Sequence, residues 1–157
     1  MTEPATSVER FLNGYGCSQA ILTQFCERFH MDQLTALKIS SAFPAGMQRA
    51  GICGAVTGAY MVLGLNFADQ DSCRSAGRKE VYEAVAEFTR RFRKRHQTLD
   101  CKGLLGCNIM TPEGRETAKQ QNLFKTVCPK FVEDAADILQ EMIENSSTSN
   151  ESPEKGS

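Results

Sequence analysis

The stretch ICGAVTGAYMVLGL, residues 52–65, decides the fold class. It is the longest apolar run of the chain and is shorter than the roughly 20 residues that a membrane-crossing helix needs. We therefore interpret it as a buried helix. Gly54 and Gly58 lie four residues apart within it, a spacing that lets another backbone approach closely; we favour tight core packing as their role.

Upstream of this run, turn residues and apolar spacing predict further helices. A short segment at 8–12 precedes the breaker NGYG at 13–16, and apolar residues then recur at helical spacing over 20–29. Asp32 is placed to cap another helix, which FPAG at 43–46 ends because proline removes a donor and restricts its predecessor. The apolar positions of that helix are Leu34, Leu37 and Ile39.

Downstream, Asp69 or Asp71 is placed to cap a long amphipathic helix that reaches about residue 95. Its apolar stripe is Val81, Val85, Phe88 and Phe92. Thr111-Pro112 predicts a short helix with proline at its first position. The last helix opens at Cys128-Pro129, and its apolar face is Phe131, Val132, Ala135, Ile138, Leu139 and Met142.

These elements predict an all-α protein, a single-domain bundle of about five to seven helices. No alternating run is bounded as a hairpin, and a length of 157 residues favours one domain. We expect the helical domain to span residues 1–144. The Ser-, Asn- and Glu-rich segment 145–157 is predicted to be a disordered tail.

The net charge limits the classes of binding partner, and the N-terminal sequence indicates the cellular compartment. The formal net charge is −1, so the basic field that non-specific nucleic-acid binding requires is missing. The first residues show no basic start followed by an apolar stretch, so no secretory signal is visible. We expect a cytoplasmic protein without nucleic acid or a membrane span.

The seven cysteines are the unusual feature of the composition. In a reducing cytosol, cysteines seldom form permanent staples, and an odd number argues against a closed disulfide framework. They are Cys17, Cys26, Cys53, Cys73, Cys101, Cys107 and Cys128, and no two have C-x-x-C spacing. Metal binding, transient redox chemistry and plain packing remain as explanations.

Three of the cysteines fall at predicted helix starts, where free backbone N–H groups stabilise a thiolate and lower the thiol pKa. Cys17 follows the 13–16 breaker, Cys53 follows Gly51, and Cys128 precedes Pro129. Cys101 lies in a turn that could bring it beside them, so it is the fourth candidate.

The sequence gives less support for a role of the other three cysteines in the site. Cys26 follows Cys17 by nine residues, which places it on the opposite side of the same helix. Packing is the favoured role of Cys26 and Cys73, because free cysteine is among the most buried residue types. Cys107 could pair reversibly with Cys101 across a glycine-containing turn, or simply fill space.

Four segments together resemble the redox-active protein family named for its C-GCAxxG-C-C cysteine pattern. The chain has CGAVTG at 53–58 and GYGCSQA at 14–20, which resemble the central and first cysteine segments of the family. CKGLLG at 101–106, and the stretch from NLF at 122–124 to Cys128-Pro129, are similar to the third and fourth. Cys107 stands where relatives often have an acidic residue, which makes it a secondary candidate.

The leading hypothesis is a redox-active protein in which Cys17, Cys53, Cys101 and Cys128 converge. They would ligate an iron-sulfur cluster for electron transfer, or act as a dithiol/disulfide couple without metal. A structural zinc site with the same four ligands is an alternative, as is a protein-interaction domain that uses the basic stretch 90–96. The redox partner, enzymatic activity and self-association are left open.

Overall fold

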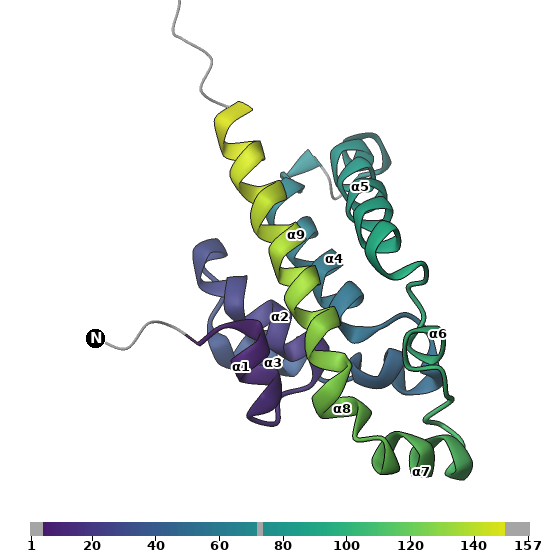
Figure 1. Ribbon diagram of the computed structural model, residues 1–157. Helices are drawn as coiled ribbons and strands as arrows, with labels where there is room; N and C mark the ends of the chain where they lie inside the picture. Colours follow the sequence, from purple (N-terminus) through teal and green to yellow (C-terminus); the bar gives the residue numbers. More distant parts are fainter. Residues whose placement is uncertain (1–4, 72–73, 150–157) are drawn as a thin grey trace, which may run out of the picture.

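The computed structural model describes residues 5–71 and 74–149, and within them the protein is all-α (Figure 1). The described residues form nine α-helices and no strand. The helices are α1 (Ser7–Leu12), α2 (Cys17–Phe25), α3 (Gln33–Ser40), α4 (Gly54–Phe67), α5 (Lys79–His96), α6 (Cys101–Leu105), α7 (Pro112–Gln120), α8 (Leu123–Thr126) and α9 (Cys128–Ser149). The all-α prediction is confirmed. The helix count exceeds the expected five to seven because α6 and α8 are too short for a periodic pattern to reveal.

Helix α4 is the central element of the bundle. It packs against α2, α5 and α9, and the long α9 also contacts α1 (Figure 1). Seven residues of α4 are buried, namely Gly54, Ala55, Val56, Gly58, Ala59, Val62 and Leu63. The interpretation of residues 52–65 as a buried helix is thus confirmed, with α4 beginning at Gly54. No helix in the described ranges combines the length and apolar character needed to cross a bilayer.

Gly58 sets the distance between α4 and α2. A Cβ at Gly58 would lie 2.8 Å from the Ser18 carbonyl oxygen and 3.0 Å from the Ser18 Cα. The two helix backbones can be this close only because position 58 has no side chain. The predicted tight core packing at the glycine pair is therefore confirmed, with α2 as the neighbour.

Local capping rules account for several helix starts. The Asp32 side chain accepts a hydrogen bond of 2.9 Å from the Thr35 N–H at the start of α3. Thr111 caps α7 in the same way, and Pro112 is the first residue of that helix. Both starts agree with the sequence prediction.

The prediction for α5 was wrong at its N-terminus. Neither Asp69 nor Asp71 caps the helix, because α5 begins at Lys79 and directly follows a 3-10 turn at Ser75–Arg78 (η4). Phe88 and Phe92 of the predicted stripe are fully buried. Val81 and Val85 of the stripe are half-buried, so the cap is the part of this prediction that fails.

The apolar positions of α3 also differ from the prediction. Leu34 and Ile39 are 58% and 51% exposed. The buried side of α3 instead consists of Ala36 and Ser40, and the Ser18 hydroxyl of α2 donates a hydrogen bond of 2.9 Å to the Ser40 carbonyl. Small residues and hydrogen bonds hold α3 against α2, so the larger apolar side chains lie outside.

Helix α9 extends further than the expected boundary at residue 144. All six residues of its predicted apolar face are buried, but the helix continues to Ser149. The Asn66 side chain of α4 donates a hydrogen bond of 3.1 Å to the Ser146 hydroxyl, which ties this last part to the bundle. The rest of the predicted tail, residues 150–157, lies outside the described residues.

Candidate functional site

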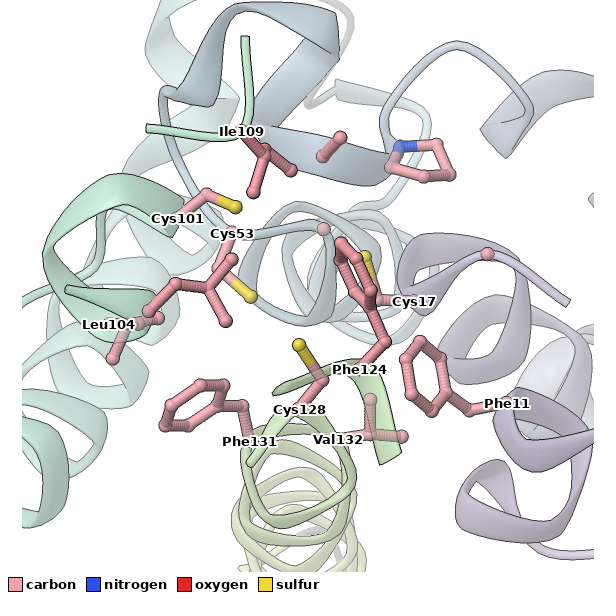
Figure 2. A pocket seen from close by; sticks show the side chains of 15 residues that line it. Phe11, Cys17, Cys53, Cys101, Leu104, Ile109, Phe124, Cys128, Phe131 and Val132 are labelled. Carbon is pink, nitrogen blue, oxygen red and sulfur yellow. The ribbon is translucent and has the colours of Figure 1, made fainter. Parts of the chain in front are cut away.

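Four of the candidate cysteines line one cavity of about 160 Å³ (Figure 2). They are Cys17, Cys53, Cys101 and Cys128. The figure shows their sulfur atoms turned toward the same space, among the side chains of Phe11, Leu104, Ile109, Phe124, Phe131 and Val132. The structure thus brings together residues far apart in sequence, while their redox and metal-ligand roles stay predictions.

Each of the four cysteines stands at the start of a helix. Cys17 is the first residue of α2, Cys128 is the first residue of α9, and Cys53 caps α4. Cys101 is the first residue of α6, whereas the sequence predicts a turn at this position. The short length of α6 explains that error, since one helical turn has no recognisable periodicity.

Backbone hydrogen bonds fix Cys53 and Cys101 beside each other. The Cys53 N–H donates to the Leu99 carbonyl at 2.8 Å, and the Cys101 N–H donates to the Gly51 carbonyl at 2.7 Å. Ile52 and Asp100 form an isolated antiparallel bridge between the same two segments. These bonds connect the α4 and α6 starts.

Cys17 is held between α4 and the loop that follows α3. Its sulfur lies directly against Gly54, because a Cβ at position 54 would overlap it. On the loop side, the Ala45 backbone hydrogen-bonds to the Cys17 sulfur. The glycine after Cys53 is therefore needed to seat the sulfur of Cys17.

The loop beside Cys17 has an unusual backbone. Ala45, Gly46, Met47 and Gln48 all adopt the left-handed conformation, with φ between 57° and 62°. Each non-glycine residue in this region costs about 1–2 kcal/mol, so the surrounding packing must hold the turn in place. This turn lies against Cys17, and backbone strain of this kind is often concentrated at functional sites.

The thiols of Cys17 and Cys53 are directly coupled. A hydrogen bond from the Cys53 side chain lowers the pKa of Cys17 to about 7, against the opposing effect of burial, and the backbone groups of Ala45 and Ser18 assist. The same contact, together with burial, raises the pKa of Cys53 well above its ordinary value. As the pH rises through about 7, the pair therefore gains its first thiolate on Cys17, while Cys53 stays a thiol.

The other two cavity thiols are protonated at neutral pH. Burial raises the pKa of Cys101 to about 11 and that of Cys128 to about 12, and the negative charge of Cys17 adds to both shifts. Of the four cysteines at helix starts, Cys17 alone has a lowered pKa, and the hydrogen bond from Cys53 is its largest cause. Loss of hydration outweighs the helix N-terminus at the other sites.

The coupling of Cys17 to Cys53 predicts a specific pH dependence of alkylation. We expect the rate at which iodoacetamide modifies Cys17 to rise with pH through a midpoint near 7, because only the thiolate reacts. Cys53→Ala removes the donor to that thiolate and should move the midpoint upward. The rate is measured by mass spectrometry of the Cys17 peptide, with Cys26→Ala as a control that should leave the midpoint unchanged. A wild-type midpoint at the ordinary thiol value would contradict the coupling.

Neither Cys26 nor Cys107 lines the cavity. Cys26 is fully buried, its thiol donates to the Thr23 carbonyl at 3.6 Å, and burial raises its pKa, all consistent with packing. Cys107 is a partly exposed free thiol that lines a separate surface hollow with Lys102 and Gly103. The interpretation of Cys73 concerns a residue outside the described ranges.

The cavity offers four thiols as ligands for a metal group. Within residues 5–71 and 74–149, no three His, Cys, Asp or Glu side chains are arranged to hold one metal ion. Zinc binds sulfur at about 2.3 Å, so its ligand sulfurs must lie within about 4 Å of one another. A cluster spreads four thiolates over separate iron atoms. Four thiols line this apolar cavity, and thiolate is a ligand type that both zinc and an iron-sulfur cluster accept.

A buried ionic network behind the cavity was not anticipated. Asp134 of α9 is 4% exposed and contacts His96 Nε2 at 2.8 Å and Arg95 at 3.0 Å. The His96 ring packs against Phe131, with ring centroids 5.0 Å apart, and Phe131 lines the cavity. The signal was present in the sequence, since Asp134 lies three residues after Phe131 and one before Ala135, on the apolar side of α9.

The basic stretch 90–96 is largely occupied by intramolecular ion pairs. Arg90 and Arg91 both contact Glu87, at 2.8 and 2.6 Å, and Arg91 also reaches Glu141 of α9 at 3.4 Å. The Glu87 pairs lie within α5, whereas the Arg91–Glu141 pair and the contacts of Arg95 and His96 to Asp134 join α5 to α9. This use of the charges weakens the protein-interaction alternative.

Comparison with known proteins agrees with the cysteine geometry. The family described as "Putative redox-active protein (C_GCAxxG_C_C)" matches residues 15–142, a range that includes all four cavity cysteines and the segment 53–58. No curated protein and no solved structure gave a match. Because the matched range covers well over half of the chain, the protein belongs to this redox-active family.

Proposed function

We propose that Cys17 and Cys53 act as a dithiol/disulfide couple that exchanges two electrons inside the cavity. The observation that supports this most strongly is the direct contact between the two side chains. Such a couple needs an accessible thiolate and a neighbouring thiol that can complete the disulfide. Cys17 is partly exposed, whereas Cys53 is 7% exposed, so the two residues suit different roles.

Cys17 is the attacking residue. Its thiolate displaces one thiolate from an external disulfide and forms a mixed disulfide with the other half. Cys53 then loses its proton to the first thiolate released and attacks the Cys17 sulfur. The second half leaves as a thiolate, which takes a proton from solvent. The protein has then lost two electrons and the external disulfide has gained two.

The surroundings support this assignment. The Ala45 and Ser18 backbone groups and the Cys53 thiol all stabilise the Cys17 thiolate. Cys101 and Cys128 stay protonated at neutral pH because their pKa values are raised. Both therefore react more slowly than Cys17.

Redox titration of the purified protein tests the proposal. After equilibration in buffers of graded thiol/disulfide ratio, we expect one two-electron transition, with the disulfide mapped by mass spectrometry to Cys17 and Cys53. Cys17→Ser and Cys53→Ser should each abolish the transition, while Cys26→Ser should retain it. A transition that survives in Cys17→Ser, or a disulfide at another pair, would overturn the assignment.

An iron-sulfur cluster is the second candidate, favoured by the four thiols around one cavity. Cys17, Cys53, Cys101 and Cys128 would hold it, and it would supply one-electron transfer. The apolar side chains that line the cavity would keep water from the ligand sulfurs. Cys128→Ser separates the two candidates: the dithiol couple should survive it, whereas cluster binding in anaerobic reconstitution with iron and sulfide should be lost.

A further inference from the structure

We propose that the cavity selects small, uncharged, apolar disulfides as the oxidant of the Cys17–Cys53 couple. This inference rests on the proposed function and names its substrate class. It follows from three features of the cavity: its lining, its size and the exposure of the residues at its rim.

The lining offers no counter-charge to an ionic substrate. Of the 15 residues that surround the cavity, the four cysteines are the only ones with ionisable side chains. The others are glycines, aliphatic residues, proline and phenylalanines. A carboxylate or ammonium group that entered would lose its hydration without gaining a partner. A carboxylate would in addition be repelled by the Cys17 thiolate.

The size of the cavity limits the substrate further. Its volume of about 160 Å³ is close to the roughly 150 Å³ of an apolar protein cavity that binds benzene. A disulfide with two short alkyl groups is of comparable size. Glutathione disulfide is several times larger and carries several charges, so the cavity cannot enclose it.

The exposure of the lining residues indicates where the substrate enters. Phe124 lines the cavity but is 45% exposed, so its ring lies at the rim. Phe131 and Val132 are 8% and 1% exposed and form the interior wall. Because Cys17 is partly exposed and Cys53 is buried, an entering disulfide meets Cys17 before Cys53, in the order that the exchange requires.

The reaction follows the exchange described above, with the alkyl groups in the apolar space. The Cys17 thiolate attacks one sulfur of R–S–S–R, which breaks the S–S bond and releases RS⁻. The Cys53 thiol gives its proton to RS⁻ and attacks the Cys17–S–S–R bond. The products are the Cys17–Cys53 disulfide and two molecules of RSH, the second formed with a proton from solvent.

Three disulfides with similar short chains test the selection: diethyl disulfide, the dication cystamine and the dianion dithiodiglycolate. The rate of Cys17–Cys53 disulfide formation is measured with each at neutral pH. Each rate is divided by the rate of the same disulfide with mercaptoethanol, which removes differences in intrinsic reactivity. We expect the corrected rate to be at least tenfold higher for diethyl disulfide than for either charged compound.

A matched pair of variants links the selection to the cavity. Leu104→Phe adds volume beside the sulfurs and should lower the rate with diethyl disulfide at least fivefold. Leu34→Phe makes the same change on the exposed face of α3, where Leu34 is 58% exposed, and should have no effect.

The outcomes distinguish this inference from the proposed function. If all three compounds form the Cys17–Cys53 disulfide at equal corrected rates, the substrate class is wrong and the dithiol couple stands. An unchanged preference and rate in Leu104→Phe would also overturn the role of the cavity. If no compound forms this disulfide, the couple itself is refuted.

Discussion

The Gly58→Ala variant is expected to be less stable than the wild type by about 1–2 kcal/mol. A methyl group at position 58 would lie 2.8 Å from the Ser18 carbonyl oxygen and 3.1 Å from the Ile21 Cβ. Its nearest neighbours belong to the α2 backbone, so they cannot rotate away and the helices must separate. Overpacking of this kind costs about 1–3 kcal/mol, and the better helix propensity of alanine offsets up to about 1 kcal/mol.

Gly64→Ala is the matched control for this prediction. Gly64 lies on the same helix, and a Cβ there would meet no atom within 4 Å. Alanine should therefore leave the free energy of unfolding unchanged or raise it by about 0.5–1 kcal/mol. Urea denaturation of the two variants measures the difference. Equal stabilities would show that α2 and α4 do not depend on the close approach at Gly58.

The second large effect is expected for Asp134→Ala, which should destabilise the protein by about 2–3 kcal/mol. The Asp134 carboxylate holds His96, Arg95 and Lys130 through contacts of 2.8, 3.0 and 3.1 Å. Hydrogen bonds to charged groups contribute about 1.5–3 kcal/mol. We place the loss below the range for fully buried pairs, because Arg95 and Lys130 are 37% and 61% exposed and can regain water. Asp137→Ala, on the exposed side of α9, should change stability by less than about 0.5 kcal/mol.

The pH dependence of stability provides a second measurement on Asp134. Burial opposes its ionisation, but the hydrogen bond from Lys130 and the charges of Lys130, Arg95 and His96 prevail and lower its pKa. A carboxyl with a lowered folded-state pKa contributes stability above its unfolded value of about 3.9, and that contribution is lost as the pH falls through the folded value. The difference in unfolding free energy between wild type and Asp134→Ala should therefore shrink in acid. A difference that does not change with pH would contradict the ionic role.

Local sequence rules were sufficient for much of the fold. The capping roles of Asp32 and Thr111, the apolar face of α9 and the buried stretch 52–65 each depend on residues within one or two helical turns. The same rules failed for α3, because Leu34 and Ile39 match a helical stripe whose other side, with Ala36 and Ser40, contacts α2. Which side of a helix is buried depends on neighbours that the local pattern does not contain.

The candidate site was predictable in its residues and not in its electrostatics. The four cysteines could be identified from their positions and from the family resemblance. Their different pKa values could not, because the contact of Cys17 with Cys53 and the burial of Cys101 and Cys128 arise only when the helix starts converge. The left-handed turn at residues 45–48 was equally hidden, since Ala45, Met47 and Gln48 are residue types that rarely adopt that conformation.

Two backbone hydrogen bonds, from Cys101 to Gly51 and from Cys53 to Leu99, crosslink the start of α4 to the start of α6. The cavity wall therefore has one part inside this crosslink and one part outside it. Cys53 and Cys101 share this crosslink. Cys17 is held beside them because α2 packs closely against Gly54 and Gly58 of α4. Cys128 is outside the crosslink, at the junction between α8 and α9. Displacement of that junction would therefore widen the space around the sulfurs without breaking either of these backbone bonds.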